Sequence, residues 1–590
     1  MRLTYIPARF NASGHHKTAK NRTSNLLFNI LAFLLITVGL ALIGVGFTEM
    51  SAPISILKSE QISLDPVNLF EYSLRTTLRM FIALVFSLIF SLLYATIAAK
   101  NSYAEEILVP LLDILQSVPI LGYISFTVTG FLLLFPNSIM GAECAAIFAI
   151  FTSQAWNLTF SFYQSLKTVP KELIEASSIF KMSKWQRFWR VELPFGIPSL
   201  VGNIVVSMSG GWFFVVAAEV ISVGNNKISL PGIGSYISVA LEHENIPSIV
   251  YALTAMILII IIYDQLILRT LVAWSDKFHY ESTGSSNAPK SWVLTLFTRS
   301  ILINKLFLPI IYFFRFIVYF PLFNYSSDTK NPEQNQEFAN YHYNRTSKYL
   351  WYFALFVIFA LASYYLFNFL QNQIKLSELL EVLQLVLITM LRVFTLVIIA
   401  SIIWIPIGIY IGLHPKLAAV MQPITQFLAA FPANLLFPLA VIGISKYDLN
   451  PNIWLSPLMI VGAQWYILFN VITGSSSFPT ELREASKNFN IKGLLWWRKV
   501  MLPGIAPYFI TGAITASGGA WNASIVAEVV SWGDKKIVLK GIGSYITQMT
   551  IEADFHRIVL GIGVMSLCIA LINHFFWQPL YNYSAKKYKF

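Results

Sequence analysis

Apolar stretches recur along almost the whole chain and are separated by short polar segments. A helix of about 20 apolar residues crosses the roughly 30 Å of hydrocarbon in a bilayer. The pattern therefore predicts an all-α polytopic membrane protein with about 12 spanning helices, six in each half. They are expected at about 27–49, 76–98, 107–133, 139–164, 195–221 and 248–273, and at about 349–371, 385–412, 418–444, 455–475, 504–530 and 557–579.

The two halves repeat each other. The segment 169–180 (VPKELIEASSIF) recurs as 478–489 (FPTELREASKNF), a shift of 309 residues, and the same shift relates the GIGSYI at 232–237 to the GIGSYI at 541–546. A constant shift over about 80 residues indicates duplication. Because each half has six spans, the two copies share one orientation. We therefore predict two parallel six-helix repeats with a pathway at their interface.

A polar linker separates the repeats. It contains an apolar, aromatic segment at about 303–322 that is interrupted by Lys305, Pro309 and Arg315. This segment is either a thirteenth span or a helix in the membrane interface, and we predict the latter because one more crossing would invert the second repeat. The predicted units are 1–275 with a core at 75–275, a cytoplasmic linker at 276–348, and 349–590 with a core at 388–580.

Composition and charge agree with a membrane protein. Only 12% of the residues are charged, whereas a soluble domain carries roughly 25%. The net charge of +12 indicates how the protein is oriented in the membrane, because Lys and Arg collect on the cytoplasmic side. It predicts that both termini are cytoplasmic. No basic helix or stacking platform points to nucleic acid. The histidines and the two cysteines, Cys144 and Cys568, show no metal-binding or catalytic spacing.

The loops between the fourth and fifth spans, 170–190 and 479–499, are unusually rich in charge for this chain. Their basic excess predicts a cytoplasmic position. Acidic residues three apart share a helix face, small residues allow a close approach, and the aromatics that begin at Phe180 and Phe489 are expected to anchor each loop on the membrane or the bundle. Two copies at the same place favour a docking helix over an ordinary interfacial helix. The residues concerned are Glu172, Glu175, Ala176 and Ser177, and Glu481, Glu484, Ala485 and Ser486.

The fifth spans carry a repeated cluster of glycine, tryptophan and acid, which we predict to line the pathway. A carboxylate in a span is a functional candidate by default, and the alternative is a structural partner to a helix end. Each second span begins near an arginine that either attracts an anion or snorkels to the lipid head groups. The candidates are Trp212, Glu219, Trp521, Asn522, Glu528, Arg79 and Arg392.

The segments 175–194 and 484–503 share Glu-Ala-Ser followed by a Trp- and Arg-rich stretch that ends in Leu-Pro. This pattern resembles the "EAA" loop of ABC-importer permeases. With Gly-Gly-Trp…Ala-Ala-Glu at 210–219 and Gly-Ala-Trp…Val-Ala-Glu at 519–528, the chain is most similar to permeases of the nitrate, sulfonate, taurine and bicarbonate group. The resemblance covers nearly all of both halves. It implies a type I ABC importer-like fold, with two permease units fused in one chain, in a bacterial cytoplasmic (inner) membrane.

The resemblance also implies partners. In that family the loop is a coupling helix that sits in a groove of a cytoplasmic ATPase, so Glu175 and Glu484 are the expected acidic contacts. The chain has no Gly-x4-Gly-Lys-Ser/Thr phosphate loop. We therefore expect no enzyme activity and no bound cofactor here, with ATP used by two copies of a separate ABC ATPase. An extracytoplasmic substrate-binding protein is a further implied partner, and the solute is expected to be a small anion, such as a sulfonate, nitrate or a bicarbonate-like compound.

An ion-coupled secondary transporter with two repeats is the alternative function, and it leaves the paired charged loops unexplained. The chain departs from the family where the loop turns, because Lys181 and Asn490 replace the usual glycine. Asn tolerates a left-handed backbone whereas Lys does so poorly, so we expect the two loops to differ in their turns. Asn522 replaces Phe213 between the repeats, which predicts a lopsided cavity.

Overall fold

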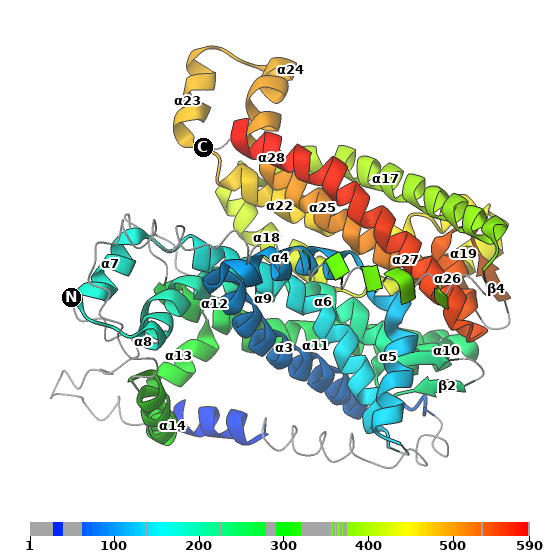
Figure 1. The fold of residues 1–590 in the computed structure, drawn as a ribbon, viewed down its shortest axis with the longest axis horizontal. Helices are drawn as coiled ribbons and strands as arrows, with labels where there is room; N and C mark the ends of the chain where they lie inside the picture. Colours follow the sequence, from blue (N-terminus) through cyan, green and yellow to red (C-terminus); the bar gives the residue numbers. More distant parts are fainter. Residues whose placement is uncertain are drawn as a thin grey trace.

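The computed structural model describes residues 28–38, 62–136, 138–223, 226–278, 291–319, 374–532 and 535–587, with scattered positions between 353 and 369. Long helices run side by side in a bundle (Figure 1). The prediction of an all-α membrane protein built from two repeats is confirmed. Two small β-hairpins, the only strands among the described residues, follow the fifth spans.

The first half contains five of its six predicted spans as long or paired helices. Its elements are η1 (Pro66–Asn68), α3 (Leu69–Lys100), α4 (Ser102–Ser117), α5 (Ile120–Leu134), α6 (Met140–Lys167), α7 (Lys171–Ile179), α8 (Lys184–Arg187), η2 (Phe188–Glu192), α9 (Leu193–Ala218), β1 (Val220–Val223), β2 (Asn226–Ser229), α10 (Ile233–Glu242), α11 (Ile246–Tyr263), η3 (Asp264–Leu268), α12 (Arg269–Ser275) and η4 (Asp276–Phe278).

The second half repeats this order. Its elements are α17 (Leu376–Gly412), α18 (Pro415–Ala430), η5 (Ala433–Leu436), α19 (Phe437–Tyr447), α20 (Pro451–Trp454), α21 (Leu458–Val461), α22 (Gln464–Ser476), α23 (Thr480–Asn488), α24 (Gly493–Trp496), η6 (Trp497–Met501), α25 (Leu502–Ala527), β3 (Val529–Trp532), β4 (Lys535–Val538), α26 (Ile542–Ile551), α27 (Phe555–Ile572), η7 (Asn573–Trp577) and α28 (Gln578–Lys587). Each element from α7 to η3 recurs 309 residues later with the same bounds, from α23 to η7. The duplication is therefore structural as well as sequential.

Six described helices are long and apolar enough to cross a membrane, and nine if each bent pair counts as one span. The fourth span of the first half, α6, is a further continuous helix of 28 residues. Of the predicted span 27–49, the structure describes Phe28–Val38, a helix, and most of the predicted span 349–371 lies outside the described residues.

The third spans, expected at 107–133 and 418–444, are present, each as a bent pair of helices. The first bends by 90° between α4 and α5, and the second by 74° between α18 and α19. Pro119 and Pro432 follow the breaks, and the residues before them, Val118 and Phe431, have extended backbones. A proline disfavours the helical conformation of the residue before it, which explains why both copies break at the same place.

The broken spans tie the halves together. Leu121 of α5 belongs to the hydrophobic core of the second half, and Ala430 of α18 and Leu435 of η5 belong to that of the first. In Figure 1 the second half, in yellow to red, lies against the first, in blue to green. Each half therefore completes the other's core.

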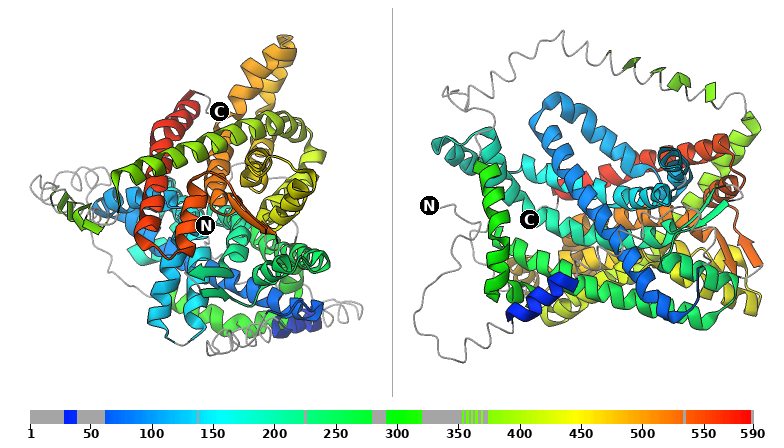
Figure 2. Two further views of the ribbon diagram at one scale, coloured as in Figure 1. Left: turned by 90° about the vertical axis from the view of Figure 1, so that its right-hand side faces the viewer. Right: turned by 90° about the horizontal axis from the view of Figure 1, so that it is seen from below.

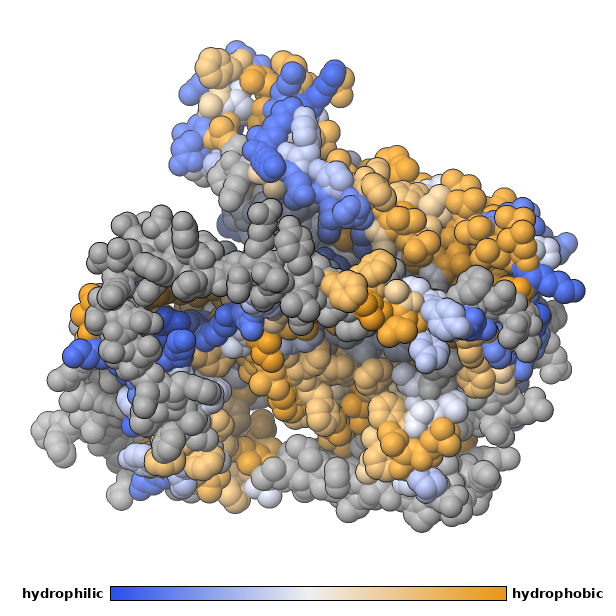
Figure 3. Space-filling model, viewed as in Figure 1, coloured by the Kyte–Doolittle hydropathy of each residue, from blue (hydrophilic) through white to orange (hydrophobic). Residues whose placement is uncertain are grey.

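The linker contains two described helices, α13 (Trp292–Arg299) and α14 (Ile301–Tyr319). The predicted helix at 303–322 is thus present, and it runs crosswise to the long spans in the right-hand view of Figure 2. Its membrane-interface position stays a prediction. On the space-filling surface, apolar residues cover the sides of the bundle around α17 and α27, as expected for lipid contact (Figure 3).

Candidate functional site

The two charged loops fold as helix–turn–helix units at the same end of the bundle. In Figure 1, α7–α8 and α23–α24 project at the end opposite the β-hairpins. In the first loop the amides of Lys181 and Met182 donate to the carbonyls of Ser178 and Ser177, and the second loop repeats both bonds at the same positions. The loops are therefore placed and closed alike.

The expected difference between the two turns is wrong. Lys181 has a φ of 50° and Asn490 a φ of 53°, so both residues adopt the left-handed conformation. The lysine is forced there by the hydrogen bonds that close the turn, although a left-handed residue other than glycine costs about 1–2 kcal/mol. The sequence departure thus stores backbone strain in the first loop without changing its shape.

The loops present acids and apolar side chains together. The carboxylates of both loops are exposed, while Ala176 and Ala485 are half-buried. Ser177 and Ser486 are only 2% and 4% exposed, so they close the loop from inside and are not offered to a partner. Phe180 and Phe489 are 60% and 79% exposed at the tips, whereas Trp496 and Trp497 pack against the core of the second half, as expected of rings that anchor the loop on the bundle.

Within its described residues, the linker contacts the first loop through α14. The Gln186 side chain donates to the carbonyl of Tyr319 at 3.1 Å, and the Arg190 guanidinium lies 5.2 Å from the centre of the Tyr319 ring. The residues at the equivalent positions of the second loop, Leu495 and Lys499, are exposed. Helix α14 therefore braces the first loop, and the part of the linker that the structure describes gives the second loop no such brace.

At the other end of the bundle, the first half holds a closed ion cluster. Arg79 binds Glu143 through two N–H groups, both at 2.6 Å, and Glu219 through a third at 2.7 Å. All three side chains are fully buried. Both alternatives for Arg79 are therefore wrong in this conformation, because the side chain neither reaches head groups nor has its fork free for an anion.

Glu219 caps the end of α9 and holds the following loop. Its carboxylate accepts from the hydroxyl of Thr76 and the amide of Gly234, both at 2.6 Å. A Cβ at Gly232 would lie 2.3 Å from the Glu219 carboxyl carbon, so only glycine lets the backbone approach so closely. The geometry fits the structural alternative for Glu219, and it explains the repeated Gly-Ile-Gly that follows each hairpin.

The equivalent cluster in the second half is weaker and more open. Arg392 lies 3.4 Å from Glu528 and 3.2 Å from the side-chain oxygen of Asn452, and its side chain is 15% exposed. The 309-residue shift places Asn452 at the position of Glu143. One guanidinium thus faces two carboxylates in the first half and one carboxylate in the second. Sequence reasoning missed Glu143, although a carboxylate inside a predicted span is a recognised signal.

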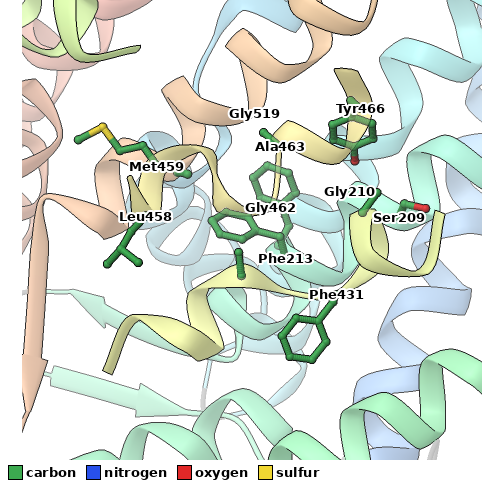
Figure 4. Close-up of a pocket in the computed structure, with 14 residues that line it drawn as sticks. Ser209, Gly210, Phe213, Phe431, Leu458, Met459, Gly462, Ala463, Tyr466 and Gly519 are labelled. Atoms are coloured by element: carbon green, nitrogen blue, oxygen red, sulfur yellow. The ribbon is translucent and has the colours of Figure 1, made fainter. Parts of the chain in front are cut away.

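A small cavity of about 70 Å³ lies between the halves (Figure 4). Its walls come from both fifth spans, α9 and α25, and from the broken third and fourth spans of the second half. The labelled residues in Figure 4 are Ser209, Gly210, Phe213, Phe431, Leu458, Met459, Gly462, Ala463, Tyr466 and Gly519.

The tryptophans and the asparagine predicted to line a pathway do not face this cavity. Trp212 and Trp521 are each 1% exposed and pack in the cores of their halves. Trp212 instead borders a second cavity of about 230 Å³, between the first half and α18. The side chain of Asn522 accepts a hydrogen bond from the amide of Ile120, at 2.8 Å, where the third span of the other half restarts. The fifth spans do line the cavity, but with residues adjacent in sequence to the predicted ones.

Comparison with known families gives a match in both halves. Residues 88–277 and 404–578 match the family described as "Binding-protein-dependent transport system inner membrane component". Among the described residues, no group of histidine, cysteine and acidic side chains could hold a metal ion.

Curated relatives are similar to parts of the chain. The bicarbonate transport system permease protein CmpB of Synechococcus elongatus is 31% identical over 175 residues, 29% of this chain and 59% of that protein. The nitrate import permease protein NrtB of Leptolyngbya laminosa is 28% identical over 30% of this chain and 59% of its own length. The glycine betaine/carnitine transport permease protein GbuB of Listeria monocytogenes is 27% identical over 28% of this chain and 54% of its own length. The chain thus spans less than two thirds of each of these relatives.

Proposed function

The chain belongs to the family of binding-protein-dependent transport system inner membrane components, the membrane permeases of ABC transporters, and we propose that it forms the whole membrane core of an ATP-driven importer. Its two units would each receive one copy of a cytoplasmic ABC ATPase, on the coupling loops α7–α8 and α23–α24. The observation that carries the proposal is the pair of loops, which share one turn and one end of the bundle and expose acids beside apolar tips. ATP hydrolysis then belongs to the partner subunits.

The loops are mechanically continuous with the walls of the cavity. Lys184–Ala218 forms one helical unit of 35 residues from the first loop to the end of the fifth span, and Gly493–Ala527 forms its counterpart. A helix of that length is about 52 Å long. Since the same units line the interface cavity, a shift of the two loops when the ATPases close on ATP would move opposite walls of the cavity. This continuity supports coupling between ATPase closure and access to the pathway.

The proposed cargo is a small solute that an extracytoplasmic substrate-binding protein delivers. Relatives are named for bicarbonate, nitrate and betaines, and the resembled group favours a small anion. We place the termini and both loops on the cytoplasmic side of a bacterial inner membrane, because loops rich in Lys and Arg stay on that side. A secondary transporter is less well supported, because Glu219 and Glu528, the acids on which its ion coupling would depend, are held in ion pairs.

The test is purification of the full chain together with a candidate ABC ATPase from the same organism. We expect two ATPase copies for each chain by native mass spectrometry, and solute uptake into vesicles that requires ATP. Uptake without any nucleotide would contradict the proposal, and so would a chain that binds no ATPase under conditions where it remains monodisperse.

A further inference from the structure

The interface cavity is lined by rings and carries no charge on its described lining residues. Phe213 enters from α9, Phe431 from the break after α18, and Tyr466 from α22 (Figure 4). Phe214 of α9 also lines the cavity. The other lining residues are glycine, alanine, leucine and methionine, apart from Ser209. The hydroxyls of Ser209 and Tyr466 are therefore the polar side-chain groups that the lining offers.

The repeats contribute different rings to the cavity. At the positions related by the internal shifts, Phe213 is replaced by Asn522 and Phe214 by Ala523. Likewise Val118 stands where Phe431 lies, and Asn157 where Tyr466 lies. A symmetric pathway would place the same groups on both walls. In this chain each half instead contributes rings at positions where the other half has none.

Glycines bring the walls of the cavity close together. The Tyr466 hydroxyl lies 3.2 Å from the position that a Cβ would take at Gly210, so any side chain there would crowd the ring. At Gly519, the equivalent position of the opposite fifth span, a Cβ would lie 2.9 Å from the Cβ of Ala463. Binding sites of this kind, mainly apolar with a few polar groups, take organic ligands and use the polar groups to orient them.

A small oxyanion would find little compensation here. Moving an anion from water into an uncharged apolar site is costly unless a cation or several donors receive it. The Arg79 guanidinium is already used by two carboxylates. The neighbouring cavity, which shares Ser209, has a cation in Arg269, but that side chain is paired with Asp264 at 2.9 Å.

We infer that the interface cavity selects an organic solute with a flat apolar or aromatic face and one hydrogen-bonding end, over inorganic oxyanions such as nitrate and bicarbonate. The inference rests on the proposed function, because it takes this cavity as part of the transport pathway. Aromatic side chains prefer such partners in offset or edge-on contact, and the two hydroxyls orient the polar end.

The test measures binding to the full chain in nanodiscs without any ATPase. The probe is benzenesulfonamide, a neutral aromatic with a polar end, followed by saturation-transfer NMR, with nitrate and bicarbonate as competitors at equal concentration. We expect saturable probe binding that neither oxyanion displaces. The variant Phe213→Asn with Phe431→Val copies the residues of the other repeat and should weaken probe binding at least tenfold.

The matched control is Phe86→Val, because Phe86 is 54% exposed on the lipid-facing side of α3, and it should leave binding unchanged. Size-exclusion chromatography checks that each variant stays folded. The inference is overturned if the parent chain shows no saturable probe binding, if nitrate or bicarbonate displaces the probe, or if the control weakens binding as much as the cavity variant. Because no ATPase is present, these outcomes do not bear on the ATP-driven mechanism. That mechanism is tested separately, by copurification with the ATPase and by ATP-dependent uptake.

Discussion

The two halves of the chain share every element from the coupling loop to the sixth span, yet they hold their functional ends differently. In the first half Arg79 is sealed between two carboxylates and the coupling loop leans on α14. In the second half Arg392 is looser and partly exposed, and its coupling loop has no brace from the described residues of the linker. The duplication therefore gives both halves the same backbone, whereas single substitutions determine how strongly side-chain contacts hold each copy in place.

The largest expected effect concerns Arg79. Changing Arg79→Ala leaves Glu143 and Glu219 buried without a cation, and we expect a loss of about 3–5 kcal/mol in the free energy of unfolding. The matched change Arg392→Ala removes a longer contact, 3.4 Å, to the single buried carboxylate of Glu528, which keeps its hydrogen bonds from Thr389 and Ser544, and it should cost about 1–3 kcal/mol. Thermal unfolding of both variants in nanodiscs measures the difference. Equal losses would remove the claimed contrast between the clusters.

The next effect tests whether Glu143 makes the first cluster tighter. Glu143→Asn copies the residue of the second half, and it removes a two-pronged charged contact while Glu219 still pairs with Arg79. We expect a loss of about 1.5–3 kcal/mol in the free energy of unfolding. The reverse change, Asn452→Glu, should have little effect because Arg392 is partly exposed. If Glu143→Asn is neutral, the second carboxylate adds nothing to the cluster.

A smaller effect is expected at the left-handed turn of the first loop. Lys181→Gly removes the Cβ clash of that conformation and should stabilise the turn by about 1 kcal/mol. Asn490→Gly should gain less, because Asn tolerates the same conformation. Hydrogen exchange at the amides of the two turns measures the gain in local stability in each variant. The same gain in both loops would mean that Lys181 carries no special strain.

The smallest effect concerns the brace from the linker. Arg190→Ala removes the cation–π contact with Tyr319, worth about 0.5–1 kcal/mol at an exposed site. We expect faster amide exchange in α7 that approaches the rate in α23, with α23 itself unchanged. As a control, Lys499→Ala at the equivalent position should change neither loop. No change in α7 would show that α14 does not steady the first coupling loop.

Much of the fold followed from the pattern of the chain. The duplicated segments and the apolar runs located ten of the predicted spans, and the paired charged loops appeared where the repeat placed them. The breaks at Pro119 and Pro432 were not predicted, because hydropathy averages over a bend. What turns each broken segment inward is packing against the other half, which is a contact between residues far apart in sequence.

The candidate sites were predicted less completely, for a similar reason. Sequence position alone could not tell that Trp212 points into a core while Phe213, the next residue, faces the cavity, because one residue along a helix turns the side chain by about 100°. The burial of Arg79 depended on Glu143, a partner 64 positions away. In the second coupling loop the pattern located the anchoring rings, Trp496 and Trp497, but it could not tell that Phe489 at the tip is exposed.

The most direct test of the account is the rate of ATP hydrolysis by the purified complex of the chain with its ABC ATPase. We predict that Glu175→Ala and Glu484→Ala each lower the rate severalfold, and that the double variant lowers it at least tenfold, while the chain remains folded. Because both carboxylates are exposed, their removal should not disturb the bundle. A double variant that hydrolyses ATP at the parent rate, with transport intact, would contradict the assignment of α7–α8 and α23–α24 as the loops through which the ATPases drive the membrane core.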